Sequence, residues 1–146
     1  MGLVDPSGEK PITIILNNPG GEDYHMLAIY DAIAKCKSHV TIIVYGQAFS
    51  AASLILQAAD ERILAPHPRV MIHLGSAGYY DHPKIVKAWA IETEKVTKDM
   101  EIIYLDRIRE KHPLFKLRQL QKLLDFDTIL SAQEAVDLGL ADKILE

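Results

Sequence analysis

The chain has 146 residues, 49% of them hydrophobic and 25% charged, and its formal net charge at pH 7 is −4. These values predict one soluble domain over residues 1–146, and the dispersed lysines and arginines exclude the basic surface of a nucleic-acid-binding protein. A single cysteine, no apolar run near the ~20 residues of a membrane span and no signal-peptide pattern predict a cytoplasmic or organelle-matrix location.

The first predicted strand lies very early in the chain. Residues 1–10 are polar and favour turns, whereas residues 11–16 form a continuous apolar run that predicts a buried strand. Little sequence precedes this strand to cover it. We therefore expect other elements, or another subunit, to supply its missing neighbour.

A glycine-containing turn and a helix come next. The cluster at residues 17–21 ends with Gly20 and Gly21, and residues 24–37 have the spacing of an amphipathic helix. Glycines let backbone N–H groups approach a ligand closely, so this turn is a candidate half of an oxyanion site. An ordinary strand-to-helix turn explains the same pattern, and no phosphate-loop motif follows. The predicted buried face of the helix consists of Leu27, Ala28, Tyr30, Ile33 and Ala34.

Residues 40–59 predict a strand, a sharp turn and a second helix. Residues 40–45 are rich in β-branched side chains, and residues 50–59 are good helix formers. Ser50 then lies at the helix N-terminus, where unpaired backbone N–H groups would stabilise a nearby oxyanion. Two interpretations remain open: a nucleophile at a strained turn, or a serine that only caps the helix.

Two further strands are predicted over residues 60–65 and 69–73. Alternation in the second places Val70 and Ile72 on one face, and His73 ends the strand before a glycine-bearing loop. A histidine there is a candidate general base, although a bystander role is the usual one for a lone histidine. His67 and His73 have no further ligands at a metal-binding spacing, so we expect no metal site.

A long helix is predicted from Pro83 to Lys111, followed by Pro113 and a short helix over residues 114–124. A helix this long either packs against a second copy or curves around its own core. Its predicted apolar stripe is Ile85, Trp89, Val96, Met100, Ile103 and Ile108.

The C-terminal segment predicts a helix followed by a strand. Ser131 and Glu134 form a capping-box pattern, Gly139 is a helix stop, and residues 140–145 predict the strand. Asp127 precedes the cap in an extended stretch and by itself is only a loop carboxylate. The repeated strand-turn-helix units at 11–37 and 40–59 predict an α/β fold with parallel strands.

Four motifs in order resemble the proteolytic subunit of the Clp protease, a self-compartmentalising serine peptidase whose fold is shared with the crotonase superfamily. The resemblance implies an α/β fold of stacked β-β-α units with a protruding handle helix, and with the N-terminal elements of the family missing. The motifs are Asn17-x-Pro19-Gly20-Gly21 with Leu27-Ala-Ile-Tyr-Asp31, Gly46-Gln-Ala-x-Ser50, Arg69-Val-Met-Ile-His73, and Ser131-Ala-x-Glu-Ala-Val-x-x-Gly-Leu-x-Asp142.

The resemblance also implies roles for individual residues. Ser50 would be the nucleophile, His73 the general base and Asp127 the residue that orients the imidazole. The backbone N–H groups of Gly21 and Ala51 would form the oxyanion hole. The alternatives weighed against these assignments are Ser53 for the nucleophile and Asp125 for the carboxylate.

Members of this family form heptameric rings, often stacked in pairs, and receive unfolded polypeptide from an AAA+ ATPase partner. The resemblance implies the same partners here and no metal or organic cofactor. The chain departs from the family at Phe126, where an arginine usually helps to couple rings, and at Leu74-Gly75, where Gln-Pro is usual. Glu22 and Asp23 add negative charge beside the oxyanion turn, which would disfavour acidic substrates.

Three other functions fit parts of the same pattern. The chain would be a non-catalytic or fragmentary ring subunit if it assembled without reacting with serine reagents. An acyl-CoA enzyme of the crotonase type would use the paired amides without a serine nucleophile. A phage capsid-maturation protease would share both the fold and the serine.

Overall fold

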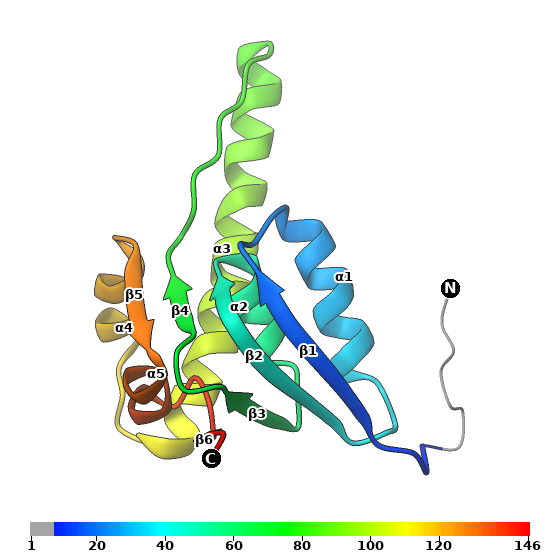
Figure 1. Ribbon diagram of the computed structural model, residues 1–146. Coiled ribbons are helices and arrows are strands. Elements are labelled where there is room, and N and C mark those ends of the chain that lie inside the picture. The colour runs from blue at the N-terminus through cyan, green and yellow to red at the C-terminus, as the bar shows by residue number, and fades with distance from the viewer. Residues whose placement is uncertain (1–7) are drawn as a thin grey trace.

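A six-stranded sheet forms the centre of the fold in the computed structural model, which describes residues 8–146 (Figure 1). The prediction for residues 1–7 lies outside this range. The strands are β1 (Ile12–Asn18), β2 (Val40–Phe49), β3 (Glu61–Leu64), β4 (Arg69–Ile72), β5 (Thr128–Ser131) and β6 (Lys143–Ile144). The helices are α1 (Asp23–Ala34), α2 (Ala51–Leu56), α3 (Pro83–Lys111), α4 (Leu117–Leu124) and α5 (Ala132–Leu138).

Strand β2 organises the sheet because it is long enough to pair with two strands on one side. It pairs with β1 along its other side, while β3 lies beside its first half and β4 beside its last three residues. All of these pairings are parallel, as is that of β3 with β6, whereas β5 runs antiparallel to β4. The predicted α/β fold with parallel strands is thus confirmed, with β5 as the exception.

The core lies in two apolar clusters that share the short helix α2. Alternate side chains of β2, including Val40, Ile42 and Val44, are buried in the first cluster, together with residues of α2 and α5. The second cluster joins α2 to α3 and α4 and includes Leu54, Ile72, Tyr104, Ile108 and Leu120. Each fully buried Leu or Ile side chain contributes about 1.5–3 kcal/mol of transfer free energy to such a core.

Helix α3 begins and ends where the prolines predicted, and its N-terminal half extends beyond the sheet (Figure 1). Val96 and Met100 are buried, but Ile85 and Trp89 are 43% and 44% exposed. The predicted apolar stripe is therefore wrong at these two positions, because the protruding half of the helix has no sheet beneath it. The ring of Tyr79, from the preceding loop, stacks on Trp89 with 5.9 Å between centroids.

Two other predictions of burial need correction. Strand β1 is an edge strand with Ile15 61% exposed, because in residues 8–146 it pairs only with β2, and the expectation that another subunit supplies its second neighbour stays a prediction. In α1, Ala28 and Ala34 are exposed and Met26 is buried, so the buried face is rotated from the predicted one. Helix α1 also ends three residues before the predicted Lys37, and α2 ends at Leu56 rather than at residue 59.

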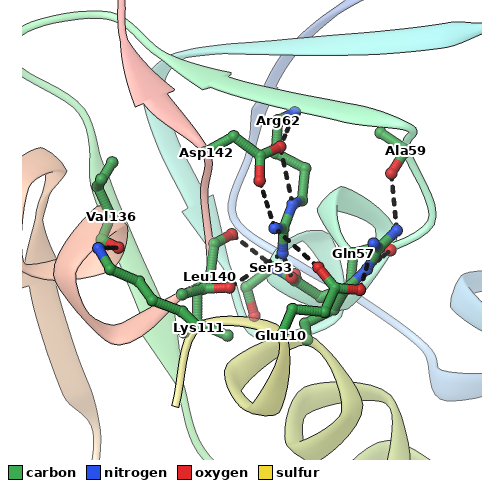
Figure 2. A network of polar contacts seen from close by, with 11 residues as sticks. Ser53, Gln57, Ala59, Arg62, Glu110, Lys111, Val136, Leu140 and Asp142 are labelled. Carbon is green, nitrogen blue, oxygen red and sulfur yellow. Dashed lines mark hydrogen bonds and ion pairs between the residues drawn. The ribbon is translucent and has the colours of Figure 1, made fainter. Parts of the chain in front are cut away.

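The C-terminal segment is fixed to the sheet by polar contacts. The capping box of Ser131 and Glu134 is present, and Gly139 ends α5 with a φ of 94°, as predicted. The buried side chain of Arg62 forms an ion pair with Asp142 (Figure 2). Burial by itself raises the pKa of Asp142, but the hydrogen bonds from Arg62 outweigh this effect and hold that pKa below its usual value. The predicted strand over residues 140–145 is reduced to β6.

No helix in residues 8–146 combines the length and apolar character needed to cross a membrane. No group of three or more His, Cys, Asp or Glu side chains in this range is placed to hold a metal ion.

Candidate active site

Ser50 occupies a strained turn between β2 and α2. Its φ of 54° and ψ of −123° make it the one residue other than glycine with positive φ in the described part of the chain. Such a conformation is unfavourable and persists only where its surroundings hold it. The Ser50 N–H donates to the carbonyl of Met71 over 2.8 Å, which fixes the turn to β4. Ser50 is the N-cap residue of α2, but its side chain makes no capping hydrogen bond, so capping does not account for its hydroxyl.

His73 is brought to Ser50 by the pairing of β4 with the end of β2. Phe49 of β2 is in register with Met71 of β4, and the two strands are parallel, so Ser50 and His73 follow at the same edge of the sheet. The Nε2 atom of His73 lies 2.8 Å from Ser50 Oγ. The Leu74 N–H donates to the carbonyl of Leu124 over 3.0 Å and anchors the chain just after the histidine.

Asp127 reaches His73 from the other neighbour of β4. Thr128, the first residue of β5, is in register with Ile72, and this pairing places the preceding residue beside the imidazole. Asp127 Oδ1 lies 2.7 Å from His73 Nδ1. A carboxylate at this position accepts a hydrogen bond from Nδ1–H and keeps the proton on Nδ1, which leaves the Nε2 lone pair free to accept the Ser50 proton.

The two alternative residues lie elsewhere. Ser53 is fully buried, and its hydroxyl contacts Tyr104 and the carbonyl of Ser50. Asp125 is the C-cap residue of α4 and is exposed, and the carboxylate that accepts the hydrogen bond from the imidazole is that of Asp127.

The glycine turn before α1 packs against the turn at Ser50. Gly20 has a φ of 102°, and a Cβ added there would lie 2.7 Å from the carbonyl oxygen of Phe49 and 2.9 Å from Ser50 Cβ. Only glycine fits this contact without a shift of the backbone. This contact of Gly20 was not predicted, since a pair of glycines in the sequence indicates a turn but not the segment that the turn touches. Gly21 and Ala51, whose N–H groups are the candidate oxyanion donors, directly follow the two residues in contact.

A cleft of about 480 Å³ opens at Ser50 and His73. Its walls come from the start of α1, from residues 74–77 and from the face of α3 that carries Thr93, Thr97 and Met100. The charged side chains at the α1 wall are both acidic, Glu22 and Asp23. Burial, and then the charge of Glu22, raise the pKa of Asp23, while His73 opposes the rise.

A serine, a histidine and an aspartate joined in this order by hydrogen bonds, on an α/β fold with the serine at a strained strand-to-helix turn, form the arrangement used by serine hydrolases. The Clp protease family model matches residues 3–146, and the chain belongs to the Clp protease family. The chain is also 34% identical over 140 residues to the ATP-dependent Clp protease proteolytic subunit of Deinococcus radiodurans. This match covers 94% of the chain and 66% of that relative, so the chain spans just under two thirds of the relative's length. The resemblance identified in the sequence is confirmed.

Proposed function

We propose that the chain is the proteolytic subunit of an ATP-dependent Clp-type serine endopeptidase, which cuts unfolded proteins to short peptides through an acyl-enzyme. The observation that carries the proposal is the continuous hydrogen-bond path from Ser50 Oγ through the His73 imidazole to the Asp127 carboxylate. Membership of the Clp protease family supports the same reaction.

In the proposed acylation step, Ser50 Oγ bonds to the carbonyl carbon of the scissile peptide while His73 Nε2 takes the hydroxyl proton. The carbonyl oxygen gains the negative charge and is stabilised by the N–H groups of Gly21 and Ala51. When the C–N bond breaks, the imidazolium returns the proton to the leaving amine. An ester on Ser50 and a free amine are the products of this half-reaction.

In the proposed deacylation step, His73 removes a proton from a water molecule that attacks the ester carbon. The tetrahedral intermediate breaks the bond to Ser50 Oγ, which regains the proton, and the second product leaves as a carboxylic acid. Asp127 keeps the proton of the resting imidazole on Nδ1 and stabilises the imidazolium in both steps. This route uses no metal and no organic cofactor.

We further propose that the chain acts as a homo-oligomer, in a heptameric ring that receives polypeptide from an AAA+ ATPase. The proposed dependence on ATP belongs to that partner. The protruding half of α3 exposes apolar side chains, including Ile85, Trp89 and Ile91. These side chains support self-association, because burying them against a second subunit would remove them from water. Phe126, which replaces the usual arginine of the family, is 77% exposed and leaves the stacking of two rings open to test. A mass measurement in solution tests the ring.

Labelling by a fluorophosphonate, which reacts with activated serines, tests the chemistry. We expect labelling of the unsubstituted chain and its loss in Ser50→Ala and in His73→Ala. Ser38→Ala is a matched serine control, because this buried hydroxyl has no hydrogen-bond partner among the described residues and lies outside the cleft. Labelling that persists in Ser50→Ala would reject the assignment of the nucleophile.

A further inference from the structure

The carbonyl group of Ser50 is held as firmly as its N–H. It accepts a hydrogen bond from the Ser53 N–H over 2.9 Å and a second one from the Ser53 hydroxyl over 2.7 Å. Together with the bond from the Ser50 N–H to Met71, these contacts fix both peptide groups of the residue with the strained backbone. The direction in which Ser50 Oγ points depends on that backbone.

The Ser53 hydroxyl is in turn held by Tyr104. Their two oxygens are 2.6 Å apart, and both side chains are fully buried. Burial raises the pKa of the Tyr104 phenol, so it carries its proton at neutral pH. Because the Ser53 proton points to the Ser50 carbonyl, the phenol must donate to Ser53 Oγ. The result is a directed chain of donors from Tyr104 through Ser53 to Ser50.

The backbone of Ser53 is fixed independently of Tyr104. The Ser53 carbonyl accepts a 2.9 Å hydrogen bond from the side-chain amide of Gln57, which also donates to the carbonyl of Leu140. The oxygen of the same amide accepts a 2.8 Å hydrogen bond from the buried guanidinium of Arg62 (Figure 2). Removing the Tyr104 hydroxyl would therefore take away one of the two hydrogen bonds of the Ser53 hydroxyl, leaving only the one to the Ser50 carbonyl, while α2 stays in place.

We propose that Tyr104 and Ser53 are positioning residues, which hold the Ser50 turn in the conformation that keeps Ser50 Oγ within hydrogen-bond distance of His73. This inference rests on the proposed function and adds to it a part for α3, whose buried half carries Tyr104. Neither residue contacts the imidazole. Their effect is exerted through the backbone, since both side chains are fully buried and neither lines the cleft.

The test compares the rate constant of Ser50 acylation by a peptide ester, and kcat and KM for the same ester, in the unsubstituted chain and in Tyr104→Phe. The ring of the variant keeps its packing and only the donor is lost. We expect acylation and kcat to fall roughly three- to tenfold, the effect of one buried hydrogen bond, while KM stays the same. The pH midpoint of acylation should not move, because the contact of His73 with Asp127 is untouched.

The matched control is Tyr30→Phe, which removes a phenol from a half-buried tyrosine outside the cleft and the chain of donors. It should react at the unsubstituted rate. Ser53→Ala removes the middle of the chain of donors and should slow acylation as Tyr104→Phe does. The double variant should be no slower than the slower single variant, because both changes break one path.

An acylation rate in Tyr104→Phe equal to that of the unsubstituted chain would overturn the inference, even if the free energy of unfolding fell, since the hydrogen bonds would then only stabilise the core. If Tyr104→Phe does not fold, Ser53→Ala decides by the same criterion. Absence of any Ser50 labelling in the unsubstituted chain would overturn the proposed function instead, so the two failures are distinguishable.

Discussion

The contact between Gly20 and the Ser50 turn predicts a large effect of a single methyl group. Gly20→Ala places a Cβ 2.7 Å from the carbonyl oxygen of Phe49, which belongs to the backbone and cannot rotate away. Alanine at this positive φ costs about 1–2 kcal/mol, and overpacking costs about 1–3 kcal/mol more. We therefore expect the free energy of unfolding to fall by about 2–5 kcal/mol. The atoms that must shift are the carbonyl oxygen of Phe49 and the Cβ of Ser50, which carries Oγ. Acylation of Ser50 should therefore slow as well.

Urea unfolding and the rate of Ser50 acylation by a peptide ester, measured on the same samples, report the two effects. The control is Gly78→Ala, since Gly78 has no atom within 4 Å of the added Cβ and does not have positive φ. It should change the free energy of unfolding by less than about 1 kcal/mol. If Gly20→Ala changed neither the free energy of unfolding nor the acylation rate of Ser50, the direct packing of the Gly20 turn against the Ser50 turn would be refuted.

Three further predictions concern charged groups. Asp127→Asn should lower kcat by about 10³- to 10⁴-fold in peptide hydrolysis, because the amide favours the wrong imidazole tautomer; a loss below tenfold would contradict the role of Asp127. Asp142→Asn should lower the unfolding free energy by about 1–3 kcal/mol at pH 7, since it leaves the buried Arg62 with only the more distant carboxylate of Glu110, at 3.7 Å, as an anion, and the partial exposure of Asp142 limits the loss. Folding lowers the pKa of Asp142, so its contribution to stability is fully present above the ordinary aspartate pKa of 3.8 and is lost as the pH falls further. The difference in unfolding free energy between the variant and the unsubstituted chain, measured in acid-unfolding curves, should therefore shrink below pH 3.8. Replacing Glu22 by Gln and Asp23 by Asn should raise cleavage of peptides with an acidic residue beside the scissile bond about fivefold relative to neutral peptides; an equal change for both peptides would contradict charge repulsion in the cleft.

Local sequence signals predicted the elements that prolines, glycines and caps delimit. Pro83 and Pro113 fixed α3 within a residue or two, and Ser131, Glu134 and Gly139 fixed α5. These signals act on neighbouring residues of the chain, so no tertiary contact is needed to read them. The alternation of Val70 and Ile72 was readable for the same reason.

Burial was harder to predict because it depends on which surfaces the fold brings together. Ile85 and Trp89 have the spacing of a buried stripe, yet the helix leaves the sheet before it reaches them. Ile15 lies in an apolar run, yet β1 is at the edge of the sheet. Periodicity identifies a face that is apolar, but it does not identify the partner that covers that face.

Sequence motifs predicted which residues belong to the candidate site, but they did not predict the contacts among those residues. The sequence left Asp125 and Asp127 as alternatives, and the register of Thr128 with Ile72 distinguishes them by placing Asp127 on the imidazole. The contact of Tyr104 with Ser53 spans 51 positions, and no local pattern signals it. A tyrosine on the buried face of a helix ordinarily contributes packing, so the sequence alone does not indicate a role for the Tyr104 hydroxyl.

The covalent acyl intermediate on Ser50 is the central claim, and mass spectrometry of the chain quenched during turnover of a peptide ester tests it most directly. The account predicts a chain heavier by the mass of the acyl group, with the added mass in the proteolytic fragment that contains Ser50 and absent from Ser50→Ala. An acyl group on another residue, or turnover with no acylated chain when deacylation is slowed at low pH, would contradict it.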